Sequence, residues 1–187
     1  MNREGLLEAL SGYTAAGTLE AESLARIRRF LASPADPFSR ENPEGHITAS
    51  AIVARPDGSA FLLVHHRKLS RWLQPGGHTE AADASALDTA LREAREETGI
   101  AQFVLPTAGE ILDVDVHAIP AHGRDPAHSH FDIRYLLTAA GQINPAAAED
   151  PARPMAWRGF AEIETSGADD SLMRALAKAR AILSTGS

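Results

Sequence analysis

The first forty-odd residues of the chain carry apolar side chains at helical spacing. One short face contains Leu6, Leu7 and Leu10, and a second contains Leu24, Ile27 and Leu31. Positions three and four apart lie on one side of an α-helix, so the pattern predicts two short helices. Thr18 suits the N-cap of the second helix, and Pro34 and Pro37 end it.

From residue 47 the pattern changes from helical to strand-like. The segments ITASAIVAR and SAFLLVHH flank a PDG turn at 56–58, which is typical of a β-hairpin. A basic loop then runs through the PGG segment at 75–77 into a helical pattern from Ser85 to Thr98, which Gly99 closes. The apolar face of this third helix contains Leu87, Ala90, Leu91, Ala94 and Thr98.

Strand patterns return after that helix. ILDVDVHAI (111–119) and SHFDIRYLL (129–137) are separated by a loop rich in Pro, Gly and His, and they predict a second hairpin. MAWRGF (155–160) predicts a later strand, and DDSLMRALAKARAIL (169–183) predicts a final helix. The order of the elements indicates one main α/β domain.

Composition narrows the classes of function. The 187 residues, 44% of them hydrophobic, are enough for one sizeable core, and the net charge of −7 argues against binding a nucleic acid polymer or an anionic membrane. The absence of cysteine excludes disulfides, thiolate zinc sites and cysteine nucleophiles. The opening residues MNREGLLEAL do not resemble a signal peptide, and no apolar run approaches membrane-spanning length, so we expect a cytoplasmic protein.

Three glutamates crowd one face of the third predicted helix. At about 100° per residue, Glu93, Glu96 and Glu97 fall inside an arc of roughly 100° that is not the apolar face. Arg92 can reach Glu96, whereas Arg95 points away, so negative charge is left over. A solvated acidic helix face is one interpretation. The glycine pair before the helix favours the other, a Mg²⁺ or Mn²⁺ site beside a phosphate.

The stretch from Gly77 to Ile100 resembles the Nudix box. That motif reads glycine, five residues, glutamate, seven residues, then Arg-Glu-aliphatic-x-Glu-Glu-x-Gly-aliphatic. The second half matches at Arg92, Glu93, Ala94, Glu96, Glu97, Gly99 and Ile100. In the first half Asp83 replaces the glutamate and eight residues, not seven, separate it from the arginine. In the family that glutamate supports the arginine. We interpret Asp83 instead as a helix N-cap.

The resemblance implies a Nudix-type α/β/α sandwich, an α/β (α+β) fold with a mixed central sheet, over residues 46–187. Residues 1–45 would form a helical extension and linker, whose apolar faces could pack on the domain or on a second subunit of a homodimer. The resemblance also implies a hydrolase that cleaves a nucleoside diphosphate linked to another group. A non-catalytic nucleotide-binding module on the same fold stays the alternative, and an isomerase of isoprenoid diphosphates lacks its cysteine here.

The resemblance also assigns roles to residues. Glu93, Glu96, Glu97 and Arg92 would be catalytic; the three glutamates and the carbonyl of Gly77 would bind the metal, with Arg92 orienting Glu96. The general base would be one of the glutamates or Glu149. Glu80 is either a further metal ligand or an exposed loop carboxylate.

Two further groups are candidates for contacts with a small nucleotide substrate. Arg67, Lys68 and Arg71 lie in the basic loop, and Trp72 and Trp157 are expected to pack rather than stack on a base.

Side chains alternate across a strand, so Asp113, Asp115 and His117 share one face, and His128, His130, Asp132 and Arg134 share another. Such a row can simply face water. We expect instead that the two rows line the substrate cleft, with Arg134 on a phosphate and His128 and His130 on the leaving group or a further metal. A nucleotide sugar, an ADP-ribose-like molecule and a nucleoside triphosphate all remain open.

Overall fold

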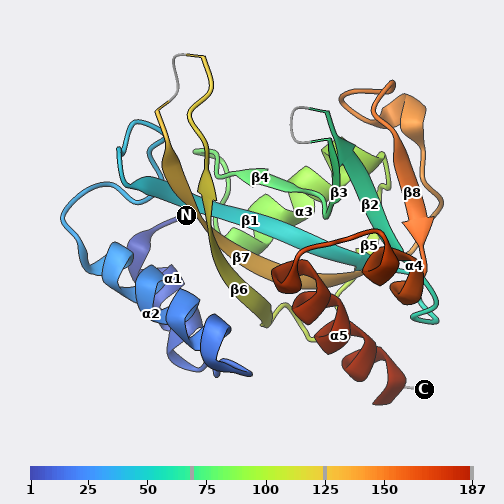
Figure 1. Ribbon diagram of the computed structural model, residues 1–187, viewed down its shortest axis with the longest axis horizontal. Helices are drawn as coiled ribbons and strands as arrows, with labels where there is room; N and C mark the ends of the chain where they lie inside the picture. Colours follow the sequence, from blue (N-terminus) through green and yellow to red (C-terminus); the bar gives the residue numbers. More distant parts are fainter. Residues whose placement is uncertain (68–69, 124–125, 186–187) are drawn as a thin grey trace.

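The strand-like segments form an eight-stranded mixed sheet in the computed structural model, which describes residues 1–67, 70–123 and 126–185 (Figure 1). The strands are β1 (Gly45–Ala54), β2 (Phe61–His66), β3 (Arg71–Leu73), β4 (Gly76–His78), β5 (Phe103–Val104), β6 (Ile111–Ile119), β7 (His128–Ala139) and β8 (Met155–Arg158). The helices are α1 (Arg3–Ser11), α2 (Thr18–Ala32), α3 (Ala86–Thr98), α4 (Phe160–Thr165) and α5 (Asp170–Thr185).

Both predicted hairpins are confirmed. β1 pairs antiparallel with β2, and β6 pairs antiparallel with β7. The two hairpins join through a parallel pairing of β1 with β7 along their whole length, which makes the sheet mixed. The order along the sheet is β3-β2-β1-β7-β5, while β4 pairs with β1, β6 with β7 and β8 with β2. The expected α/β (α+β) fold class is therefore confirmed.

Alternation along β1 divides the core between the two sides of the sheet. Ile47 and Val53 belong to a cluster with α3, α1 and α2, whereas Ile52 and Ala54 belong to a cluster with α5. Side chains two apart lie on the same side of a strand, so one strand serves both cores. In Figure 1, α3 lies behind the sheet and α5 in front of it. At the start of β1, the positions on the same side as Ile52 carry polar side chains instead: His46, Thr48 and Ser50.

The ends of α3 correct one expectation. Ser85 is the N-cap, because its side chain accepts a hydrogen bond from the backbone amide of Asp88, so the interpretation of Asp83 as the cap was wrong. Gly99 ends the helix in the left-handed conformation (φ 67°), as predicted. At α2 the N-cap position is Gly17, which makes no side-chain bond, and Thr18 is already helical.

The N-terminal helices pack on the sheet of their own chain. Leu10, Ile27 and Phe30 are fully buried, and the ring of Phe30 stacks on Phe131 of β7 with the centroids 4.0 Å apart. α2 also lies along β6 (Figure 1). The helices thus share a core with the rest of the chain, and the division into an extension (1–45) and a domain (46–187) stays a prediction. Over the described residues, no helix is long and apolar enough to cross a membrane.

Candidate functional site

The glutamates of α3 lie against the glycine pair of β4. A Cβ atom on Gly77 would fall 2.4 Å from Oε1 of Glu93, and one on Gly76 would fall 2.4 Å from Oγ of Ser50. The amide of Gly76 donates a hydrogen bond to Oε2 of Glu97 at 3.2 Å. Only glycine allows the strand and the carboxylates to approach this closely.

Arg92 connects this carboxylate cluster. Its Nη1 donates to Glu93 and Glu96 at 3.0 Å each, and its Nη2 donates to the carbonyl of His78 at 2.8 Å. Asp83 completes the set, with hydrogen bonds from Nε at 3.1 Å and from Nη2 at 3.0 Å. The guanidinium therefore neutralises part of the cluster and fixes the position of Glu96.

Asp83 replaces the first glutamate of the motif in function as well as in place. Its carboxylate also accepts from the amide of Glu80 at 2.8 Å and from the hydroxyl of Thr89 at 2.9 Å, and the residue is buried. The extra residue before Arg92 is absorbed in the loop, where Ser85 takes the cap. Asp83 is thus free to hold the arginine, which is the role that the resemblance gives to the glutamate of the motif.

Burial makes the cluster costly to ionise without a cation. Desolvation raises the pKa of Glu93 to about 7, with Glu97 and Glu96 adding to the rise and Arg92 opposing it. Desolvation also raises the pKa of Glu97, against the effects of Arg153 and the Gly76 amide. Glu96 is more exposed. Carboxylate oxygens are the donors that a hard divalent cation takes, so the chemistry of these side chains fits one.

The connection between β7 and β8 supplies Arg153, which the sequence did not single out, and Glu149, which it did. Arg153 pairs with Glu97, although 56 positions separate them. The backbone amide of Glu149 donates to the carbonyl of Glu96 at 2.7 Å, which places the alternative general base beside the end of α3. Glu80 stays at the rim, 59% exposed and 3.8 Å from Nη1 of Arg92, so both of its interpretations stand. No local pattern marks Arg153.

Residues 45–177 match the NUDIX domain. The chain belongs to the NUDIX family. A "Probable DHNTP pyrophosphohydrolase" of Lactococcus lactis is 39% identical over 98 residues, which cover 51% of this chain and 55% of that protein. The match therefore spans about half the length of this curated relative.

Solved structures confirm the NUDIX fold. A MutT NUDIX hydrolase of Burkholderia pseudomallei is 21% identical, with 74% of this chain and 98% of that chain covered and a TM-score of 0.52. An Ap4A hydrolase of C. elegans is 17% identical, with 73% and 97% covered and a TM-score of 0.51. At these identities the likeness shows the fold alone.

The second polar region of the NUDIX domain lies on the α5 side of the sheet. Across β6, β7 and β1, side chains in register form rows. One row contains Asp113, Arg134 and Ser50. The next row contains Asp115, Asp132 and Thr48. The polar side chains of β6 therefore lie next to those of β7. A third row contains only histidines: His117, His130 and His46.

Arg134 lies inside this region. Only 3% of its side chain is exposed, and its guanidinium contacts Asp132 at 2.9 Å, Asp115 at 3.3 Å and Asp113 at 3.4 Å. It also donates to the hydroxyl of Ser171 at 2.7 Å. These partners satisfy the arginine within the protein, and its contact with a substrate phosphate stays a prediction.

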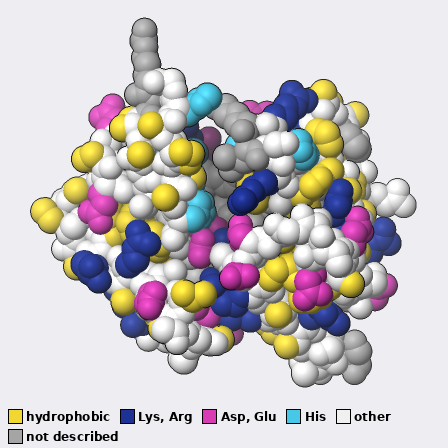
Figure 2. All heavy atoms as spheres, in the orientation of Figure 1, with side chains coloured by type: hydrophobic (Ala, Val, Ile, Leu, Met, Phe, Trp, Pro, Cys, Tyr) yellow, Lys and Arg dark blue, Asp and Glu magenta, His cyan; other side chains and the backbone are white. Residues whose placement is uncertain are grey.

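A cavity of about 720 Å³ opens between α2, β6 and the start of α5, and Figure 2 shows the hollow between the two halves of this face. Arg71, His117 and Arg134 are among its lining residues, whereas Arg67 contacts Asp150 at 3.5 Å and the carbonyl of Ala152 at 2.9 Å. Lys68 lies outside the described residues. His130 lies beside His46 and His78, and the ring of His128 lies 5.3 Å from that of His130.

The two tryptophans have packing roles, as expected. Trp72 packs against the α5 core with the guanidinium of Arg158 4.3 Å from its ring centroid, and Trp157 packs against the α3 core with Arg55 at 5.2 Å. Packing and the contacts with the two arginines therefore account for both rings.

Proposed function

We propose that this NUDIX protein is a pyrophosphohydrolase that depends on Mg²⁺ or Mn²⁺ and cleaves a phosphoanhydride bond in a nucleoside diphosphate linked to another group. The observation that carries the proposal is the glutamate face of α3, held against Gly77 and braced by the pair of Asp83 and Arg92. A solvated helix face would not bury Glu93 and Glu97 or require glycine opposite them.

Each residue of the site has a distinct task in this mechanism. Glu93, Glu96, Glu97 and the Gly77 carbonyl would hold the cation, and Arg92, itself fixed by Asp83, orients Glu96. When bound, a divalent cation neutralises charge on the phosphoryl oxygens and acidifies the attacking water. One of the glutamates, or Glu149, accepts the proton from that water. Arg71, at the cavity, is suited to bind a substrate phosphate.

The substrate classes are a nucleotide sugar, an ADP-ribose-like molecule and a nucleoside triphosphate, to which the name of the Lactococcus relative adds DHNTP. The partner would be a small nucleotide rather than a nucleic acid polymer or a membrane, and the location cytoplasmic. A homodimer stays a prediction that sedimentation at the assay concentration would test.

A non-catalytic nucleotide-binding module is the second candidate. One observation favours it: the guanidinium of Arg153 already neutralises Glu97, one of the carboxylates that would hold the metal. In a binding module this arginine would remain in place and no turnover would follow. In the hydrolase it would move aside when the cation binds.

The test is a substrate panel of the classes above with Mg²⁺, Mn²⁺ or a chelator. Glu96→Gln removes one charge from the site, and Glu164→Gln removes an exposed charge on α4 as the matched control. We expect metal-dependent release of a nucleoside monophosphate or phosphate that falls at least about 100-fold in Glu96→Gln only. Saturable binding of a panel member without turnover under either metal would select the binding module.

A further inference from the structure

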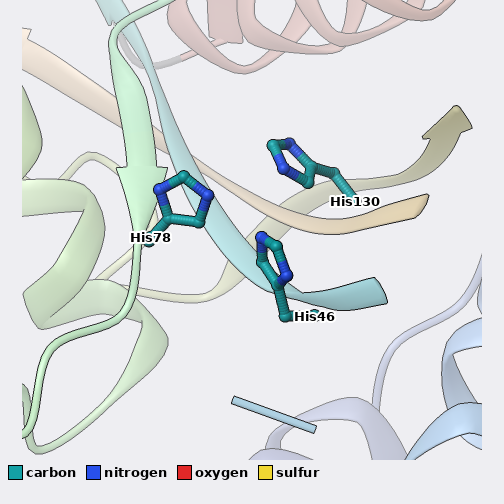
Figure 3. Close-up of side chains that lie close together, drawn as sticks. All are labelled: His46, His78 and His130. Atoms are coloured by element: carbon teal, nitrogen blue, oxygen red, sulfur yellow. The ribbon is translucent and has the colours of Figure 1, made fainter. Parts of the chain in front are cut away.

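Strand pairing gathers three histidines on the α5 side of the sheet. His46 of β1 and His130 of β7 are direct partners in the parallel pairing, and His78 of β4 pairs with Thr48, two positions from His46 on the same side. The ring centroid of His46 lies 4.7 Å from that of His78 and 4.9 Å from that of His130. The three rings converge (Figure 3), with one ligating nitrogen of each within 4.8 Å of the others.

The ring nitrogens of His46 are buried without a hydrogen-bond partner among the described residues. The residue is only 3% exposed, yet neither Nδ1 nor Nε2 has a hydrogen-bond partner. A buried polar group without a partner typically costs about 1–3 kcal/mol. In the adjacent row the buried polar side chains do have partners: Asp132 accepts hydrogen bonds from Thr48 at 3.1 Å and from Ser50 at 2.8 Å. The histidine row therefore points to a ligand.

We propose that His46, His78 and His130 bind a transition metal ion of the zinc class. Imidazole nitrogen suits Zn²⁺, Co²⁺, Ni²⁺ and Cu²⁺, whereas Mg²⁺ and Ca²⁺ prefer oxygen. Tetrahedral coordination at about 2.0–2.1 Å sets ligand nitrogens about 3.3 Å apart, so small rotations of the rings bring them into position. Three protein ligands leave a fourth position for water or for an oxygen of a bound molecule.

Neighbouring side chains support the three ligands. Nδ1–H of His117 donates a hydrogen bond to the carboxylate of Asp115 at 3.0 Å, and the His117 ring lies 5.5 Å from that of His130. His117 also lines the cavity, so the cavity reaches the edge of the histidine cluster. Asp115 therefore holds His117 in place beside the proposed ligand His130.

The proposed site is separate from the glutamate site, because the two use opposite sides of β4. A side chain at Gly77 would point at Glu93 of α3, whereas the next residue, His78, points its ring toward His46. The backbone carbonyl of His78 accepts a hydrogen bond from Arg92. One short strand therefore stands between an all-oxygen donor set and an all-nitrogen donor set.

The test is a titration of untagged, chelator-treated protein with Co²⁺ and Zn²⁺ in excess Mg²⁺. Tetrahedral Co²⁺ absorbs visible light, so it reports coordination without any enzyme assay. We expect one equivalent of Co²⁺ that Zn²⁺ displaces. His78→Gln and His130→Gln should each weaken binding about 100-fold or more, since even loss of a supporting residue costs about 10–100-fold. The exposed His122→Gln is the matched control.

Two controls separate this proposal from loss of fold and from the glutamate site. Zn²⁺ should raise the melting temperature of the wild type and of His122→Gln but not of His78→Gln, while circular dichroism shows all three folded. Glu96→Gln should keep the Co²⁺ spectrum while losing hydrolysis. No Co²⁺ spectrum in the wild type, full binding in the folded His78→Gln and His130→Gln variants, or loss of the spectrum in Glu96→Gln would each overturn the proposal.

Discussion

The guanidinium of Arg92 donates hydrogen bonds to three carboxylates and one backbone carbonyl. Of these acceptors Asp83 is the most important. It alone accepts two hydrogen bonds from the guanidinium, one on each carboxylate oxygen, and it is itself buried. The interactions raise the pKa of Arg92 far above its ordinary value, first through the hydrogen bonds to Asp83. The charge of Arg92 is thus permanent, and Asp83 determines where it lies.

Asp83→Asn should lower both stability and activity. The amide keeps the shape of the carboxylate but leaves Arg92 without its main counter-charge, so we expect a loss of about 2–3 kcal/mol in the free energy of unfolding. Turnover should fall because Arg92 no longer holds Glu96 in one position. Urea unfolding and steady-state kinetics measure the two effects. Glu162→Gln removes an exposed ion pair on α4 as the control, and an equally large loss there would contradict this account.

Gly77→Ala should abolish metal-dependent turnover with little effect on secondary structure. The added methyl group would fall 2.4 Å from Oε1 of Glu93, so the carboxylate must leave its position. We expect kcat to fall at least about 100-fold. Gly141→Ala is the matched control, since a Cβ there has nothing within 4 Å. Equal activity in the two variants would show that Gly77 is not tightly constrained.

At the scale of elements, α2 contributes four buried apolar side chains to the core, Leu24, Ile27, Phe30 and Leu31. Phe30 is 1% exposed and its ring stacks on that of Phe131 of β7, in the cluster that also contains Ala49 and Ala51 of β1. The face predicted from Leu24, Ile27 and Leu31 is the face that is buried. The helix therefore completes the hydrophobic core on one side of the sheet.

Phe30→Ala should destabilise the whole protein. Truncation of a buried phenylalanine typically costs about 3–5 kcal/mol, through lost burial and a residual cavity. Leu19→Ala, on the same helix but 62% exposed, should change stability by less than about 0.5 kcal/mol. Thermal and urea unfolding give the comparison. A small effect of Phe30→Ala would show that residues 1–45 are an independent extension after all.

Periodicity in the sequence predicted the long elements because burial repeats along them. The predicted hairpin indicated that the polar rows of β6 and β7 would meet, but not which residues pair, such as His117 with His130. The meeting of His46 with His78 was not predicted, because β4 has three residues, too few to show a period. Arg153 was missed for a related reason: its partner lies 56 positions away, and only the folded chain brings the two together.

At the scale of the whole molecule, a buried ion pair connects the beginning and the end of the chain. Glu20 of α2 is fully buried and pairs with Lys178 of α5, 158 positions away, while Tyr13 donates a hydrogen bond to the same carboxylate. Burial alone would raise the pKa of Glu20, but the hydrogen bonds from Lys178, Tyr13 and the Ala16 amide outweigh it and lower the pKa. The ionised form is therefore the stabilising one.

The contribution of Glu20 to stability should disappear in acid. Its pKa is lowered on folding, so the stabilisation is present above the pKa of the unfolded chain and is lost as the pH falls through the folded value. Glu20→Gln should lower the free energy of unfolding by about 1–3 kcal/mol at pH 7, with a smaller difference from the wild type at pH 3. Urea titrations at several pH values test this. Glu22→Gln, exposed on the same helix, should show no such pH-dependent difference.

The parallel pairing of β1 with β7 has a consequence for how the protein is made. Paired residues such as Thr48 and Asp132 are 84 positions apart, so β1 leaves the ribosome long before its partner exists. At about 5–20 residues per second, the wait is roughly 4–17 s. During that time β1 lacks the strand with which it makes its longest pairing, and the histidine set lacks His130. We therefore expect slow folding that begins after most of the chain is synthesised, and metal binding only after that step.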